Sequence, residues 1–361
     1  MCTSVCSEVS ELRGHLDREL DAPTLPMSTA SLQTDERFSF WLFDTEGRYG
    51  VVCWHLATVP GMADIRREFA GFILPGGRAL VVQGAGPRTT SAGPGAAGSI
   101  FRCEKPFGLW TGQFRGTARD ASQHELATGP LQDGPRVLVE LTFNARMAAP
   151  PWVLGGLSDN SGIEIGRRYE QLFRADVDLR VGAEHFGFSA TGVRTHNLRS
   201  GLGSPPQEPR PSPTPSGSKV GITWQTALFP SGRAFGSMRF AREDGSLGFT
   251  EGFVLHNGEL LPARVVDSPW RTAPLSLDAP LLIELESVVG TSTIMGQTVG
   301  AIHKTVAPGT GDRGWFRCGV HPVGRVDAHA IARYEWREEA TFGLLSMELP
   351  SSIVNGLAQR R

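Results

Sequence analysis

The chain has little net charge and no long apolar run. Its 361 residues include 35 lysines and arginines and 37 aspartates and glutamates, which gives a formal charge of −2. Because no excess of positive charge marks a surface for phosphate groups, we expect neither a nucleic acid nor a membrane as a partner. No stretch reaches the roughly 18 apolar residues of a membrane span, and acidic residues occur where a signal peptide needs an apolar core. We therefore expect a soluble, cytoplasmic protein.

The common motifs for metals, nucleotides and hydrolysis are missing or incomplete. The five cysteines form no CxxC pair, and the nine histidines include no HxH or HExxH, so no metal is expected. The G-x-S-x-G elbow of a serine hydrolase does not occur. GPGAAG at 93–98 satisfies G-x-G-x-x-G, but no helical period follows it, so we interpret it as a Gly-rich hairpin loop. We predict that the protein uses no cofactor.

Turn-forming residues and alternating runs dominate what is present. The chain has 44 glycines and 25 prolines, which favours β-structure over helix. Residues 169–181 alternate cleanly, with Tyr169 and Gln171 on the apolar face and Glu170 on the other. One face is expected in a core and one in water, as antiparallel sheets permit. Strands of this length suit a β-barrel.

The same period of two recurs near the end of the chain, in DAHAIARYEWRE. Tyr334 and Trp336 share the apolar face of this run, while His329 lies on the opposite one. We expect Asp327 and His329 on the solvent face, where a metal site is not favoured.

The domain organisation follows from a change of pattern at each end and in the middle. Apolar residues spaced by three and four between 6 and 20 predict a short amphipathic helix. The segment 205–215 contains six prolines and is predicted to be a linker or loop. The predicted parts are an N-terminal helix or tail (1–30), a first domain (31–199), the Pro-rich segment (200–219), a second domain (220–350) and a C-terminal tail (351–361).

Several polar and aromatic side chains are candidates for a site, each with a structural alternative. Tyr169 and Gln171 are either hydrogen-bonded core residues or residues that line a pocket, because a buried polar group needs a partner or a ligand. The motif GVRTHNLRSG at the end of a strand contains Arg194, His196 and Arg199. These side chains either lie in a solvated corner or turn inward, where the histidine could move a proton. The aromatic residues, core or ligand platform, are Trp224, Trp270, Tyr334 and Trp336.

The order of these motifs resembles one known family. RYEQ is followed by GVRTHNLR, by the Trp-bearing strand ITWQTALF and by FPSGRAFGS, and this resembles tandem lipocalin-like proteins of the AttH/CrtC type. That family includes carotenoid hydratases and Diels-Alderases of natural-product pathways. The resemblance spans most of residues 35 to 350, and its motifs are short.

The resemblance implies an all-β fold of two packed lipocalin-like antiparallel β-barrels, with the short N-terminal helix added. It also implies an apolar pocket near the junction of the domains, close to the arginine and histidine motif. By position, Arg194, His196 and Arg199 match the family motif, and Tyr169, Glu170 and Gln171 match its YEQ. Thr195 and Ser346 stand where the family commonly has carboxylates, and Asn197-Leu198 replaces Ser-Trp-Gly.

Three functions remain open from the sequence, and the first two involve an apolar molecule such as a terpenoid, polyketide or steroid. The first is a cofactor-independent hydration, dehydration, isomerisation or cyclisation, with His196 as the proton donor or acceptor, assisted by Tyr169, Gln171 or Glu170. The loss of candidate acids shifts the expectation towards cyclisation or binding. The second is a carrier that binds the same class of ligand unchanged. A third hypothesis, the Pro-rich segment as a polyproline ligand, rests on composition alone.

We expect the arginines of the GVRTHNLRSG motif to fix strand ends and backbone carbonyls, and we expect His196 to border the pocket.

Overall fold

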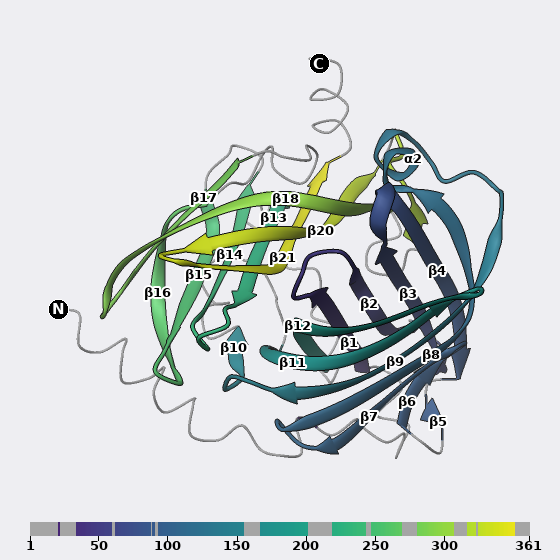
Figure 1. The fold of residues 1–361 in the computed structure, drawn as a ribbon, viewed down its shortest axis with the longest axis horizontal. Helices are drawn as coiled ribbons and strands as arrows, with labels where there is room; N and C mark the ends of the chain where they lie inside the picture. Colours follow the sequence, from purple (N-terminus) through teal and green to yellow (C-terminus); the bar gives the residue numbers. More distant parts are fainter. Residues whose placement is uncertain are drawn as a thin grey trace, which may run out of the picture.

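Two antiparallel β-sheets make up the structure. It is a computed structural model that describes residues 21, 34–59, 62–87, 89–90, 93–154, 167–200, 219–242, 247–268, 280–306, 316–322 and 324–350. Figure 1 shows one sheet in purple to teal and the other in green to yellow. No helix among these residues is long and apolar enough to span a membrane. The predicted N-terminal helix, the Pro-rich segment and the C-terminal tail lie outside the described residues.

The first sheet closes into a barrel. Its neighbouring strands pair antiparallel, and the pairing of β9 with both β8 and β11 completes the circle. Short strands and one helix extend it: β5 (Thr89–Thr90), β6 (Gly93–Ala96), β7 (Ser99–Lys105), β10 (Trp152–Leu154) and α2 (Gln123–Thr128). The eight barrel strands, in order around the circle, are β11 (Arg167–Val181), β12 (Glu184–Ser200), β1 (Thr34–Asp44), β2 (Gly50–Val59), β3 (Met62–Ile73), β4 (Arg78–Pro87), β8 (Leu109–Ser122) and β9 (Arg136–Met147).

The second sheet closes in the same way, through the pairing of β17 with β18. A short strand, β19 (Phe316–Cys318), pairs with β18 outside the circle. The prediction of an all-β fold with two antiparallel barrels is therefore confirmed. The eight strands are β13 (Lys219–Leu228), β14 (Ala234–Arg242), β15 (Leu247–His256), β16 (Glu259–Asp267), β17 (Pro280–Ser287), β18 (Gly290–Val306), β20 (Arg325–Trp336) and β21 (Glu339–Pro350).

The segment GPGAAG does form a hairpin. Strand β6 ends at Ala96 and β7 begins at Ser99, and the two strands pair antiparallel across the turn. A strand, β7, comes directly after the glycines where a dinucleotide loop would need a helix, so the geometry of such a loop is not present there.

Side chains fill the interior of each barrel. In the first barrel the inward positions of β11 alternate as predicted, and Phe173 packs on Phe40 and the other rings of the core. In the second, Tyr334 is fully buried and donates its hydroxyl to the Leu344 carbonyl at 2.8 Å, while Trp336 packs edge-on against Phe229. Because large rings occupy both interiors, the space between the barrels becomes the place to look for a ligand site.

A third cluster of apolar side chains joins the two barrels. The outer faces of β1, β2 and β12 contact β13, β20 and β21 (Figure 1). Trp41 of the first barrel packs edge-on against Trp224 of the second, with ring centroids 4.9 Å apart. Contact is close elsewhere too, since a Cβ on Gly50 would lie 2.4 Å from the Ile331 side chain. A wall of the first barrel that would otherwise face water is thus buried.

Candidate functional site

The site residues predicted from sequence divide between the two faces of the β11–β12 wall. Because successive residues of a strand point to opposite faces, Tyr169 and Gln171 point into the first barrel and Glu170 points out towards the second. On β12, Arg194 and His196 point inward, where Arg194 lies over the Trp110 ring and His196 stacks on Phe38. The backbone register aligns Tyr169 with His196 and Gln171 with Arg194. Four of the predicted residues therefore meet inside one end of the first barrel.

Arg194 is the centre of this inner network. Its side chain is 1% exposed, and its Nη2 donates to Asp21 Oδ1 at 2.6 Å and to Gln171 Oε1 at 2.7 Å. The Tyr169 hydroxyl donates to the same Asp21 oxygen and lies 3.1 Å from His196 Nδ1. Asp21 was not a candidate from the sequence, because a single acidic residue in a segment without strand pattern carries no signal.

A second buried ion pair borders the first. Arg66 and Glu36 pair with both side chains fully buried, and His196 Nε2 lies 3.2 Å from Glu36 Oε1. His196 is stacked on Phe38 with ring centroids 4.3 Å apart. Both ring nitrogens of His196 are therefore engaged by protein groups.

This placement corrects one expectation. Arg194 and His196 were expected beside a pocket at the barrel junction, with the arginine holding backbone carbonyls. Their partners are instead side chains of the first barrel and Asp21. The physical reason is the pleat of β12, which turns both residues away from the second barrel. Trp270 and the side chain of Arg199 lie outside the described residues.

The outward-facing residue, Glu170, lies at the junction. Its side chain is 3% exposed and accepts a hydrogen bond from Arg168 Nη2 at 2.7 Å. It lines a small cavity between the barrels together with Trp152 and Val193 of the first barrel and Phe253 of the second. The cavity has room for about one water molecule. Glu170 was expected on a wet face, and it is buried because the second barrel covers this wall.

A second carboxyl group reaches the junction from the other barrel. Glu251, on β15, accepts a hydrogen bond from Trp152 Nε1 at 2.9 Å. Burial and, to a smaller extent, the nearby charge of Glu170 raise the pKa of Glu251 to about 7 against the opposing effect of the hydrogen bond from Trp152. Burial likewise raises the pKa of Glu170 to about 7, although Arg168 and Trp224 favour its charged form. Two neighbouring carboxyl groups whose pKa values are both raised by burial are a typical sign of acid–base function.

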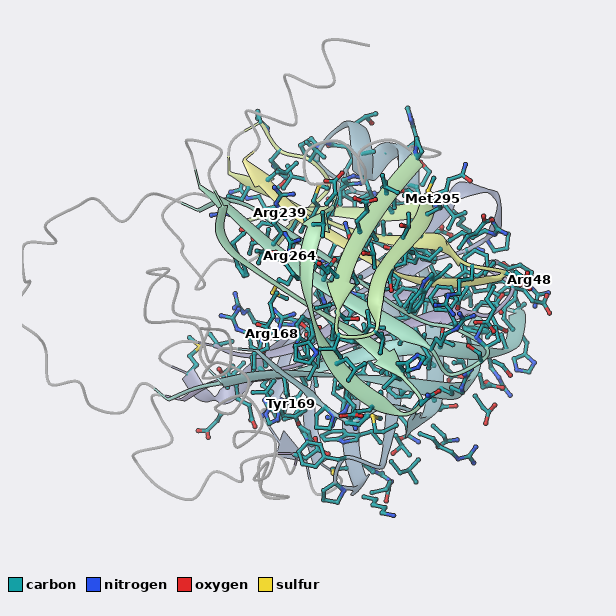
Figure 2. All side chains as sticks on the ribbon, turned by 90° about the vertical axis from the view of Figure 1, so that its left-hand side faces the viewer. Arg48, Arg168, Tyr169, Arg239, Arg264 and Met295 are labelled. Carbon is teal, nitrogen blue, oxygen red and sulfur yellow. The ribbon has the colours of Figure 1, made fainter. Side chains whose placement is uncertain are left out.

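Aromatic rings surround the two carboxyl groups. The Arg168 guanidinium lies 4.7 Å from the centroid of the Trp224 ring, and Trp152 packs edge-on on Phe253 at 4.7 Å. Arg168 and its strand neighbour Tyr169 are labelled close together in Figure 2. Trp224, a predicted ligand-binding residue, therefore belongs to the junction, whereas Tyr334 and Trp336 belong to the core of the second barrel.

Thr195 and Ser346, the two positions where the sequence resemblance led us to look for carboxylates, face the same junction. Thr195 is buried and aligns with Glu170 across β11 and β12. Ser346 is buried and aligns with Trp224, and its Oγ lies 3.1 Å from His329 Nδ1. A hydroxyl group at each position cannot supply the acid that a carboxyl group would, whereas Glu170 and Glu251 each bring a carboxyl group to the junction.

The expectation for Asp327 and His329 is wrong in part. His329 is buried, and its Nε2 lies 3.2 Å from Asp327 Oδ2, which raises the pKa of His329 to about 9 against the opposing effect of burial. Lys304 also pairs with Asp327, at 3.1 Å. The face is covered by the first barrel, since His329 lies near the Trp41 ring. Among the residues that the structure covers, no group of histidine, cysteine and acidic side chains is arranged to hold a metal ion.

Comparison with known proteins supports the fold. No family model and no curated protein matches the chain. Among solved structures, CghA with Sch210972 aligns at a TM-score of 0.50 and 10% identity, over 92% of this chain and 95% of that chain. The chain shares the fold of CghA. Other matches are AttH from Nitrosomonas europaea (TM-score 0.49, 11% identity, 90% and 96% covered) and kievitone hydratase from Nectria haematococca (TM-score 0.47, 10% identity, 93% and 98% covered). The resemblance seen in the sequence is thus confirmed at the level of the fold.

Because its pKa is raised, Glu170 is expected to make the free energy of unfolding depend on pH. Because the group keeps its proton in the folded protein up to about pH 7 but loses it near 4.5 when unfolded, its contribution is fully present below pH 4.5 and is lost as pH rises to 7. We expect Glu170→Gln to gain stability relative to the parent protein by about 2 to 3 kcal/mol over this range. Urea unfolding at several pH values measures this difference. A difference that stays constant with pH would contradict the raised pKa.

Proposed function

We propose that the junction between the barrels binds an apolar small molecule, and that Glu170 and Glu251 exchange a proton with it. The reaction is a cofactor-independent hydration, dehydration, isomerisation or cyclisation. The observation that carries the proposal is the approach of two carboxyl groups from different barrels: buried Glu170 lines a small cavity together with Trp152, and half-buried Glu251 accepts a hydrogen bond from the Trp152 indole. A ligand of this class needs an apolar wall and few polar groups to orient it.

The chemistry follows from the two environments. A general acid or base works best when its pKa is near the working pH, and both carboxyl groups titrate near 7. Because they repel each other when both are charged, one is expected to keep its proton while the other is ionised. Arg168 contacts Glu170 and favours its charged form, so Glu170 is assigned as the base and Glu251 as the acid. The ring of Trp152, which lines the cavity, can stabilise positive charge that develops on the substrate.

This assignment retains Glu170 from the residues predicted for proton transfer. The side chains of His196, Tyr169 and Gln171 belong to one hydrogen-bonded network inside the first barrel, and Gln171 is also among the residues that line the cavity. Because the cavity has room for about one water molecule, binding of a larger ligand requires side chains such as Trp152 to move aside. The fold itself suits a small-molecule ligand, since CghA was crystallised with Sch210972.

The test begins with the ligand that the protein retains. Native mass spectrometry of protein purified from its own host extract should show a bound apolar molecule, which is then identified and incubated with fresh protein. Conversion to a new product supports the enzyme, and recovery of the unchanged molecule supports the alternative function of a carrier. A protein that comes out empty and binds none of a panel of terpenoids, polyketides and steroids would contradict both.

A further inference from the structure

The carboxylate of Asp21 occupies a pocket of converging donors at one end of the first barrel. Its side chain is fully buried. One oxygen accepts hydrogen bonds from Arg194 Nη2 at 2.6 Å and from the Tyr169 hydroxyl. The other accepts from Trp110 Nε1 at 3.1 Å and from the backbone N–H of Phe107. Four donors from separate parts of the barrel therefore meet on one carboxylate.

The pocket is built for a single negative charge. In the described part of the chain, Asp21 is the acidic partner of Arg194, and burial of the guanidinium without it would be costly. Burial raises the pKa of the Asp21 carboxyl, but Arg194 and the hydrogen bonds from Phe107, Tyr169 and Trp110 outweigh it and hold that pKa below its usual value. The charged carboxylate is thus the form that the pocket selects.

The carboxylate of Asp21, unlike the side-chain donors that surround it, comes from outside the paired strands of the barrel. Tyr169, Arg194 and Trp110 are held in paired barrel strands, whereas Asp21 lies in a turn and is in none of the described strands. Phe107 lies in the turn between β7 and β8 and is only half-buried, so this end of the pocket borders the surface. The rings of Phe107 and Tyr169 meet edge to face, with centroids 5.5 Å apart, and give the pocket an apolar rim.

We propose that this pocket is a binding site for a small monocarboxylate, and that Asp21 is an internal carboxylate that competes with it. The ligand's two oxygens take the place of the Asp21 oxygens on Arg194, Tyr169, Trp110 and the Phe107 amide. Its apolar part packs against the aromatic rim. The site lies on the opposite face of the β11–β12 wall from Glu170, so it does not depend on the function proposed for the junction.

The test uses the full chain with Asp21→Ala and sodium acetate as the probe, at constant ionic strength set with sodium chloride. We expect acetate to raise the thermal midpoint of Asp21→Ala in a saturable way, with an apparent affinity at least tenfold higher than for the parent protein. Adding Tyr169→Phe should weaken the response, and Glu251→Gln, at the junction, should not change it. A folded Asp21→Ala protein that responds equally to acetate and chloride would overturn the proposal and leave Asp21 as a tether only.

A second measurement keeps the test decisive if Asp21→Ala does not fold. The indole N–H resonance of Trp110 in the parent protein, assigned by its loss in Trp110→Phe, reports on the group that bonds to Asp21. Acetate at millimolar to molar concentration should shift this resonance to a plateau, and matched chloride should not. Absence of an acetate-specific shift would contradict the proposal.

Discussion

Replacing Arg194 with alanine is expected to lower the free energy of unfolding by about 3 to 5 kcal/mol, because removal of one partner leaves a buried charge without compensation. Arg194 is 1% exposed and pairs with Asp21, which is fully buried. The substitution also removes the hydrogen bond that Arg194 donates to Gln171 and the cation–π contact of its guanidinium with the Trp110 ring. Urea unfolding followed by tryptophan fluorescence measures the loss.

Two matched variants show whether the ion pair is the cause. The double variant Asp21→Ala/Arg194→Ala removes both charges. It should lose less stability than the sum of the two single variants and be more stable than Arg194→Ala alone, with a coupling free energy of about 1 to 3 kcal/mol. Arg264→Ala removes an exposed arginine, labelled in Figure 2, which forms an ion pair with exposed Glu286, and it should change stability by less than about 1 kcal/mol. A folded Arg194→Ala protein as stable as the parent would contradict the buried network.

Glu251→Gln is expected to reduce turnover of the retained ligand by about 10²- to 10⁴-fold, the usual contribution of a positioned acid or base. The amide keeps the shape of the carboxyl group and can still accept from Trp152, but it cannot donate a proton near neutral pH. Glu170→Gln should cause a loss of the same order, for lack of the base. Single-turnover kinetics with each variant and with the parent protein give the comparison.

The affinity and the pH profile separate chemistry from folding in this experiment. Both variants should bind the ligand within a few-fold of the parent, and the parent's turnover should fall on the alkaline side of pH 7 as Glu251 loses its proton. Glu286→Gln, an exposed site on the second barrel, serves as the control and should keep full turnover. Retention of full turnover by both junction variants would remove the two glutamates from the reaction.

The fold was largely predictable because strands with one apolar face show a regular alternation of apolar and polar residues in the sequence. The run from 169 to 181 and the run around Tyr334 both showed it, and both became walls of closed barrels. Alternation also placed Tyr169 and Gln171 correctly on the inner face of β11. The alternation does not predict how one barrel packs on the other. A barrel wall that a second domain covers can carry the same charged residues as a wall that faces water.

The candidate site was therefore only partly predictable. Glu170 was a candidate because it lies in RYEQ, but its burial depends on strands more than 50 residues away in the sequence. Glu251 had a faint signal, the single charged residue in the run GFTEGFVL. Asp21 had none. His196 was predicted as the proton carrier, and its engagement by Tyr169 and Glu36 inside the barrel follows from pairings that a local pattern cannot show.

A titration of the glutamate side chains by ¹³C NMR tests the central claim most directly, because it needs no ligand. The signals of Glu170 and Glu251 are assigned by their loss in Glu170→Gln and Glu251→Gln. Both carboxyl groups should titrate near pH 7, and the pKa of Glu251 should fall in Glu170→Gln, where the neighbouring charge is gone. Titration of both groups near 4.5, as in an unfolded chain, would contradict the assignment of the junction as an acid–base site.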